Sequence, residues 1–336
     1  MTVYIVMDIG GTHARIALST PEGLQKVEFF KCTKYDGPGA VVDAYCQKTR
    51  IEKPAQGVFA VAGPMTTKDA HRVTNGPWSE HPVDFTNFGV ESTLMNDFAA
   101  QAYATLVLTP EDYEVVVPGE AFFPSVLLSQ QTITTDSHHL IAKSLAGQRI
   151  VVMGPGTGLG VASAVVVDGK FLVLDCEGSH GPLPAKSEDE FAIFDRIRKE
   201  KGGPISFETV CSGPGLVSTY NAVAAGRHRI EDPEHIEALV KAKDRDALKT
   251  LDIFTRVMGR CAATSALVTN AQGGVVIAGG VIGKLGRAFN KEIFTQEFRA
   301  NDLGKNNILL HVPVHAVTNR NSGLLGAHAY AQFFLN

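Results

Sequence analysis

Two glycine-rich stretches of this chain combine residue types that bind phosphate groups. In the first, Asp8-Ile9-Gly10-Gly11-Thr12, a carboxylate and a glycine pair lie between two apolar, β-rich runs. Glycine has no Cβ, so backbone N–H groups there can approach a bulky anion closely. Asp8 would repel a phosphate group directly, but it can hold Mg²⁺, which bridges to phosphate oxygens. We therefore expect a phosphate-binding hairpin turn with a metal-associated carboxylate.

The second stretch, residues 154–160, repeats this pattern of strand, glycine turn and strand. It contains Gly154, Gly156, Thr157, Gly158 and Gly160 and lies between apolar runs at 150–153 and 163–167. Two such copies indicate related halves that face each other across a cleft. Unrelated hairpins with flexible turns are the alternative, but the four glycines and the threonine favour phosphate binding. Neither copy matches the dinucleotide or P-loop fingerprint, which disfavours those folds.

An Asn96-Asp97 pair forms the end of an expected strand at 91–97 and precedes an expected helix at 98–106. The carboxyl end of a strand is a common place for reactive groups in α/β sheets. Asp97 is therefore a candidate catalytic carboxylate. It could instead cap the helix that follows, and one carboxylate could do both.

Two loops carry side chains that suit a polyhydroxylated ligand. Glu177 and His180 can accept and donate hydrogen bonds to hydroxyls, and no third side chain nearby completes a metal site. Asn75 and the only tryptophan, Trp78, would suit the hydroxyls and the apolar face of a sugar, although Asn75-Gly76 is equally well explained as a turn. The sequence around Glu208, taken alone, predicts only a charged side chain exposed to solvent.

The composition is that of an ordinary globular protein. With 336 residues, 44% hydrophobic and 20% charged, the chain is long enough for two domains. Its net charge of −4 provides no basic surface for nucleic acid or an anionic membrane. No apolar run reaches the roughly 18 residues of a membrane span. Five scattered cysteines and the absence of a secretory signal predict reduced thiols in a cytoplasmic protein.

Strand-like and helix-like segments alternate, which indicates an α/β protein. A buried strand at 275–278 meets Gly279-Gly280 ahead of a helix from about Ile282, an arrangement that favours anions or lets a flat base approach. We also expect a strand from Asn307 to Val314 and a last helix from Ser322 to about Phe334.

Taken in order, these motifs resemble those of the bacterial-type ATP-dependent glucokinases, which belong to the hexokinase group and the actin-like ATPase superfamily. Residues 8–12 are similar to the first phosphate motif of that fold, residues 156–160 to its second and residues 278–280 to its adenosine motif. The similarity spans the chain. It departs from the family at His13, where Asn is usual, and at Ser179, where Gly is common. The related ROK group carries a cysteine-rich zinc motif that this sequence lacks.

The resemblance implies a two-domain actin-like ATPase (ribonuclease H-like) fold of the α/β class, with duplicated β-hairpin and sheet cores around a central cleft. The small domain would comprise residues 1–107 and 319–336, and the large domain residues 108–318. The implied activity is transfer of a phosphoryl group from ATP to the 6-hydroxyl of D-glucose, in a homodimer. Two alternatives remain: an actin-like-fold kinase of another hexose or of an acid, and a non-catalytic sugar-sensing or filament-forming relative.

The resemblance also implies roles for individual residues. Asp97 would be the catalytic base, and Mg²⁺ would lie near Asp8, bound through water. The sugar hydroxyls would be held by Asn75, Asn96, Asp97, Glu177, His180 and Glu208. The nucleotide would be held by Asp8, Gly10, Gly11, Thr12, Gly156, Thr157, Gly158, Gly279 and Gly280.

Overall fold

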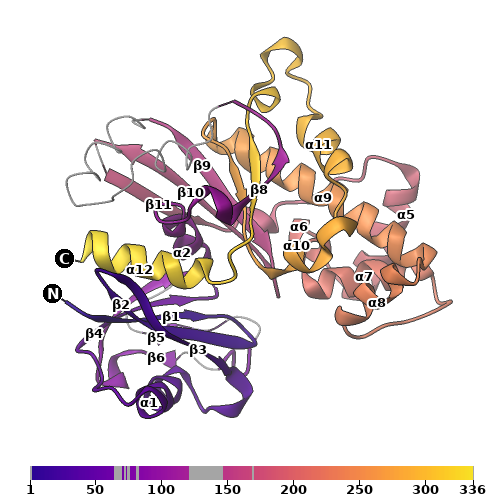
Figure 1. Cartoon of the computed structure of the whole chain (residues 1–336). Helices are drawn as coiled ribbons and strands as arrows, with labels where there is room; N and C mark the ends of the chain where they lie inside the picture. Colours follow the sequence, from indigo (N-terminus) through magenta and orange to yellow (C-terminus); the bar gives the residue numbers. More distant parts are fainter. Residues whose placement is uncertain are drawn as a thin grey trace.

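The computed structural model contains two large β-sheets with two helices, α2 (Asp97–Ala104) and α12 (Ser322–Phe334), packed between them (Figure 1). It describes residues 2–63, 70–71, 73, 76–80, 83–120, 147–168 and 170–335. None of the helices in these ranges has both the length and the apolar character needed to cross a membrane.

The sheet of the N-terminal half has five strands in the order β3-β2-β1-β4-β7. β1 pairs antiparallel with β2 and parallel with β4, and β4 pairs parallel with β7. Every residue of β1 is buried, because helices cover both faces of the sheet, and this explains its apolar run from Tyr4 to Met7. The strands are β1 (Tyr4–Ile9), β2 (His13–Thr20), β3 (Gly23–Lys31), β4 (Gln56–Val61) and β7 (Glu91–Asn96), with a separate ladder of β5 (Ala70–His71) and β6 (Val83–Asp84).

The second sheet has six strands in the order β11-β10-β9-β12-β13-β8. β9 pairs antiparallel with β10 and parallel with β12, β12 pairs parallel with β13, and β8 adds an antiparallel edge. These strands are β8 (Tyr113–Val117), β9 (Arg149–Pro155), β10 (Leu159–Val167), β11 (Lys170–Cys176), β12 (Val275–Ile277) and β13 (Val314–Val317).

The two sheets repeat one topology. The run β3-β2-β1-β4-β7 has the same order and the same strand directions as β11-β10-β9-β12-β13. Each glycine-rich turn therefore joins the first two strands of its half, β1 to β2 and β9 to β10. This confirms the duplicated hairpin-and-sheet architecture predicted from the sequence.

Helices cover the outer face of each sheet. α1 (Pro38–Thr49) packs through Val41, Val42 and Tyr45 on the five-stranded sheet, which we call the small sheet. The six-stranded sheet, which we call the large sheet, carries a cluster of helices from the second half of the chain. These are α5 (Glu188–Lys201), α6 (Phe207–Val210), α7 (Gly213–Ala224), α8 (Glu234–Lys241), α9 (Arg245–Thr269), α10 (Gly280–Leu285) and α11 (Lys291–Arg299). The short 3₁₀ segments are η1 (Cys32–Lys34), η2 (Thr86–Phe88), η3 (Pro110–Asp112), η4 (Gly178–His180), η5 (Gly286–Ala288), η6 (Gly304–Asn306) and η7 (Ile308–Leu310).

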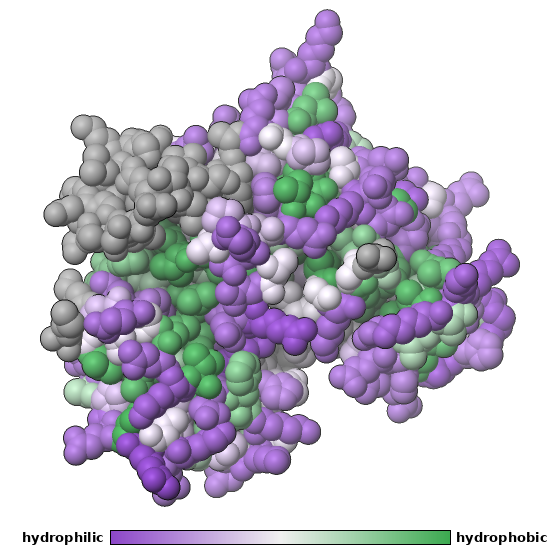
Figure 2. Space-filling view, in the orientation of Figure 1, coloured by the Kyte–Doolittle hydropathy of each residue, from purple (hydrophilic) through white to green (hydrophobic). Residues whose placement is uncertain are grey.

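The helix pair between the sheets joins the two cores. Ala100 of α2 belongs to a cluster with α12 and the small sheet, while Ala102 and Leu106 pack on the large sheet. The two helices touch at Gly326 of α12, where a Cβ would overlap the carbonyl oxygen of Ala100. On the face shown in Figure 2, apolar residues gather along α12, whereas the outer rim of the molecule is hydrophilic.

One expected strand is wrong. Asn307 to Val314 was expected to be extended, but residues 308–310 form the 3₁₀ helix η7 and the strand β13 begins only at Val314. The side chain of Asn307 accepts a hydrogen bond from the N–H of Leu309 at 3.0 Å, which caps the helical turn. Pro313, which has no N–H to donate to a sheet, immediately precedes the strand.

Candidate active site

A cavity of about 430 Å³ is lined by residues of both halves of the molecule. Both glycine turns, the N-terminus of α2, the loop after β11 and α6 contribute to its wall. The candidate residues that line it are Asp8, Gly10, Gly11, Thr12, Asn96, Asp97, Gly156, Thr157, Gly158, Glu177, His180, Glu208 and Gly279. Gly280 starts α10 next to this wall, and Asn75 lies outside the described residues. The structure thus brings nearly all the sequence candidates together, while their individual roles stay predictions.

Two groups with positive or partial positive charge lie beside the Asp8 side chain at the end of β1. Arg15, directly opposite on β2, donates from Nη1 to Asp8 Oδ2 at 2.9 Å. The N-terminus of α12 lies on another side, because a Cβ on Gly323 would come within 2.7 Å of Asp8 Oδ2. A helix N-terminus carries a partial positive charge. The side chain of Asp8, only 7% exposed, is therefore held in a fixed position at the cavity wall.

Hydrogen bonds with α6 and with the start of α7 hold the second glycine turn in place. The N–H of Leu159 donates to Glu208 Oε2 at 2.8 Å, and the N–H of Gly213 donates to the carbonyl of Gly156 at 2.8 Å. A Cβ added at Gly156 would meet no atom within 4 Å, so the turn faces open space. That space is available for an anion that approaches the backbone closely.

Asn96, and not Asp97, caps α2. Its Oδ1 accepts from the N–H groups of Phe98 and Ala99 at 2.8 and 3.1 Å, while its Nδ2 donates to the carbonyl of Gly63 at 3.0 Å. Asp97 is the first helical residue, and its Oδ1 also accepts from the N–H of Phe98 at 3.0 Å. The cap therefore leaves the second carboxylate oxygen of Asp97 available to a ligand in the cavity.

The carboxyl group of Asp97 has an unusual proton affinity. Burial, followed by repulsion from the Asp8 carboxylate, raises the pKa of Asp97 to about 7, although two backbone N–H groups oppose the shift. A carboxylate whose pKa lies near neutral pH is a better proton acceptor than an ordinary one. Such perturbed groups in a cleft are typical of catalytic sites.

The rim of the cavity carries the Glu177–His180 pair. His180 Nε2 lies 3.4 Å from Glu177 Oε2, and both side chains are more than half exposed. Between them Ser179 is buried, which anchors the short η4 turn. Downstream, Gly181 accepts from the N–H of Phe207 at 3.3 Å, which connects this loop to the α6 segment that carries Glu208.

The family model that describes glucokinases matches residues 5–333 of this chain. The chain belongs to the glucokinase family. It is 32% identical over 338 aligned residues to the glucokinase of Xanthomonas campestris pv. campestris (strain B100), covering 97% of this chain and 94% of that protein. The crystal structure of a glucokinase from an Antarctic psychrotroph superposes with a TM-score of 0.76 at 29% identity, covering 98% of both chains. The glucokinase of Balamuthia mandrillaris in complex with glucose has the same fold, with a TM-score of 0.77 at 21% identity over 98% of this chain and 94% of that one.

Trp78 does not line the cavity, although its residue type would suit the apolar face of a sugar. Its side chain is 7% exposed within the core of the small sheet, and its Nε1 donates to the carbonyl of Tyr35 at 3.0 Å. The indole therefore stabilises the small half of this glucokinase-family chain. The neighbouring Gly76 lies against the backbone of Gly11, where a Cβ would approach the Gly11 carbonyl oxygen to 2.6 Å.

Sequence reasoning did not single out Arg15 and Phe98 as residues of the candidate site. Both line the cavity, and the ring of Phe98 occupies the space where a Cβ on Gly160 would lie. Hairpin register could have revealed Arg15, since pairing across the Gly10–Thr12 turn places it opposite Asp8. Phe98 gives no such signal, because its packing partner lies on a distant strand.

Proposed function

We propose that this chain transfers the γ-phosphoryl group of ATP to the 6-hydroxyl of D-glucose. The convergence of both glycine turns and the raised-pKa carboxylate of Asp97 on one cavity is the observation that carries the proposal. Family membership supports the reaction class, and the glucose held by the Balamuthia protein supports the choice of sugar.

Phosphoryl transfer depends mainly on positioning and on stabilising spread negative charge. Backbone N–H groups of the two glycine turns supply fixed donors for phosphate oxygens. Asp97 orients the attacking hydroxyl and accepts its proton as the bond to phosphorus forms. Asn96, Glu177, His180 and Glu208 hold the remaining hydroxyls, with Asn75 proposed for the same pocket. A sugar epimer that leaves one of these groups unpaired would lose roughly 1–3 kcal/mol.

Mg²⁺ fits this site as a companion of the nucleotide. The described residues contain no group of three or more His, Cys, Asp or Glu side chains that could hold a metal ion. Mg²⁺ is commonly bound by one or two carboxylates together with phosphate oxygens and water, a pattern that Asp8 satisfies. When bound, the ion would neutralise phosphate charge, and Asp8 would fix its position through water.

The direct test is ADP release from MgATP with and without glucose. Strong glucose-dependent release supports the proposal. Bound nucleotide without sugar-dependent release would overturn it, and parallel reactions with mannose, fructose and acidic substrates would then identify another phosphoryl acceptor.

The glucose reaction should slow as the pH falls through about 7, the pKa of Asp97. Protonation removes the lone pair that accepts the hydroxyl proton, so kcat/KM for glucose should decrease about tenfold per pH unit below that value. A profile from about pH 5.5 to 8.5, with circular dichroism confirming the fold at each pH, measures this. A flat profile would contradict the role of Asp97 as base.

Glu208→Gln should raise KM for glucose about tenfold and leave kcat nearly unchanged, because hydrogen bonds to a charged group contribute about 1.5–3 kcal/mol. The glutamine oxygen can still accept from Leu159, so the glycine turn is preserved. Steady-state kinetics measures the effect, with Glu237→Gln on the exposed face of α8 as the control. An unchanged KM would make Glu208 a purely structural residue.

Three broader features belong to the same proposal. The domain limits are 1–107 with 319–336 for the small domain, and 108–318 for the large domain.

A homodimer is proposed. It is supported by the apolar side chains of Leu172 and Leu174, which are exposed on the edge strand β11. Sedimentation velocity tests the oligomeric state. The cytoplasm is the proposed compartment, supported by five cysteines that are all free thiols.

A further inference from the structure

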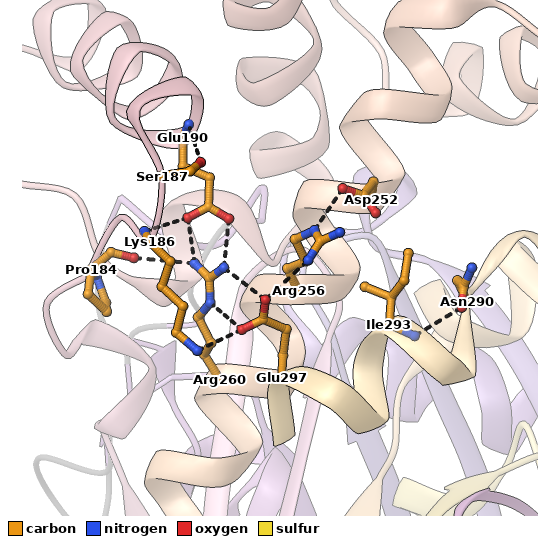
Figure 3. Close-up of polar contacts among 10 residues, drawn as sticks. All are labelled: Pro184, Lys186, Ser187, Glu190, Asp252, Arg256, Arg260, Asn290, Ile293 and Glu297. Atoms are coloured by element: carbon orange, nitrogen blue, oxygen red, sulfur yellow. Dashed lines mark hydrogen bonds and ion pairs between the residues drawn. The ribbon is translucent and has the colours of Figure 1, made fainter. Parts of the chain in front are cut away.

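A buried arginine joins three helices of the layer that covers the six-stranded sheet (Figure 3). Arg260 of α9 donates through Nη1 and Nη2 to Glu190 of α5 at 2.8 and 2.6 Å. It donates through Nε and Nη2 to Glu297 of α11 at 2.9 and 3.2 Å. The side chain of Arg260 is 5% exposed, so these bonds form in a region shielded from water. A planar guanidinium with five donors can bridge two carboxylates in this way, whereas a lysine cannot.

The same cluster holds the backbone that leaves the Glu177–His180 loop. Arg260 Nη1 also donates to the carbonyl of Pro184 at 3.4 Å, and the N–H of Lys186 donates to Glu190 Oε2 at 2.7 Å. Lys186 Nζ donates to Glu297 Oε2 at 2.8 Å. Figure 3 shows the Pro184 and Lys186 groups converging on the carboxylate–guanidinium centre. Residues 184–186 are thus attached to the helical layer by backbone and side-chain bonds.

The attached segment lies close in sequence to His180, and the residues between them contact the segment that precedes Glu208. Only residues 181–183 separate His180 from Pro184. Within that interval Gly181 accepts from the N–H of Phe207, and Pro182 forms a β-bridge with Ser206. Phe207 and Ser206 directly precede Glu208. A shift of residues 184–186 would therefore move the His180 loop and the Glu208 segment together.

We infer that Arg260 is a positioning residue. By anchoring residues 184–186, it sets the placement of Glu177, His180 and Glu208, which form the proposed sugar-binding part of the cavity. The inference rests on the proposed sugar-binding role of those three residues. Among the described residues, no bond joins the first glycine turn to this cluster, and the second turn is attached to it only indirectly, through the bonds of Leu159 to Glu208 and of Gly213 to Gly156. A defect at Arg260 therefore acts on sugar affinity more than on ATP affinity.

Arg260→Lys tests the inference, because lysine keeps the positive charge but has only three donors on one nitrogen, so it cannot keep the two paired carboxylate bonds together with the bond to the Pro184 carbonyl. We expect KM for glucose to rise at least about fivefold, while kcat and KM for ATP change less than about twofold. Arg256→Lys is the matched control: Arg256 lies one turn away on α9 and, among the described residues, donates to Asp252 and Glu297 and not to residues 184–186. Its glucose KM should equal that of the wild type.

Two further measurements separate positioning from general stability. Met258→Ala removes a buried side chain of α9, and it should lower the melting temperature without changing KM for glucose. Hydrogen–deuterium exchange of residues 178–187 should accelerate in Arg260→Lys whatever the substrate proves to be. If Arg260→Lys does not fold, Glu190→Gln replaces it, with the same expected rise in KM. An unchanged glucose KM and unchanged exchange, or a parallel change in kcat and both KM values, would overturn the inference. Absence of glucose turnover in the wild type would instead overturn the proposed function.

Discussion

Replacing Asp97 by alanine should lower kcat for glucose phosphorylation at least about a hundredfold while the chain stays folded. The variant loses the only group proposed to accept the hydroxyl proton. It keeps the α2 cap, because Asn96 provides that cap. Single-turnover and steady-state ADP release measure the loss. Asp195→Ala, which removes a partly exposed carboxylate on α5 that does not line the cavity, is the control and should retain full activity. Near-normal turnover of Asp97→Ala would remove Asp97 as the base.

The same position offers an independent check through stability. Since the pKa of Asp97 in the folded chain is raised to about 7, folding favours its protonated form. The stability it contributes is present at acidic pH and is lost as the pH rises through about 7. Asp97→Asn should therefore have a higher melting temperature than the wild type at about pH 8, and this advantage should shrink at about pH 5. Equal melting curves at both pH values would contradict the raised pKa.

Gly326→Ala should destabilise the chain by about 1–3 kcal/mol or more and lower kcat at the same time. Its new Cβ would overlap the carbonyl oxygen of Ala100, and backbone atoms cannot move aside as a flexible side chain can. α12 would be pushed away from α2, whose first residue is Asp97. Urea denaturation measures the change in the free energy of unfolding, and kinetics on the folded fraction measures the displacement of Asp97.

Gly283→Ala is the matched control for this substitution. Gly283 is also helical, in α10, but a Cβ there would meet no atom within 4 Å. Alanine is favoured over glycine in a helix by about 1 kcal/mol, so this variant should be at least as stable as the wild type. If Gly326→Ala were equally stable, the close α2–α12 contact would be wrong.

Much of the architecture and most of the candidate site could be predicted from the sequence, because they rest on local patterns. The two glycine turns lie between apolar strands that any α/β sheet would bury, and their repetition indicated the duplicated topology that the structure confirms. The Asn96-Asp97 pair stands where a strand meets a helix. Only the assignment of the cap to Asn96 required the structure.

What the sequence could not provide are contacts between distant segments. Trp78 is equally suited to a sugar or to a core, and only the carbonyl of Tyr35 and the surrounding apolar residues decide between them. The Arg260 cluster joins three helices that are far apart in the sequence, so no spacing rule indicates it. The strand expected at 307–314 failed because the local hydrogen bond of Asn307 outweighed the apolar character of Ile308, Leu309 and Leu310.

The position of α12 has a consequence for how the chain is made. Its residues Leu324, Ala327 and Ala331 complete the buried cluster of the first sheet, together with Tyr4 and Val6 of β1. Ribosomes release the N-terminal segments first, at about 5–20 residues per second. The apolar face of β1 and β4 therefore stays without its covering helix, α12, until the entire second sheet has been synthesised. During that interval the nascent first half exposes its apolar face, which makes it a binding surface for chaperones.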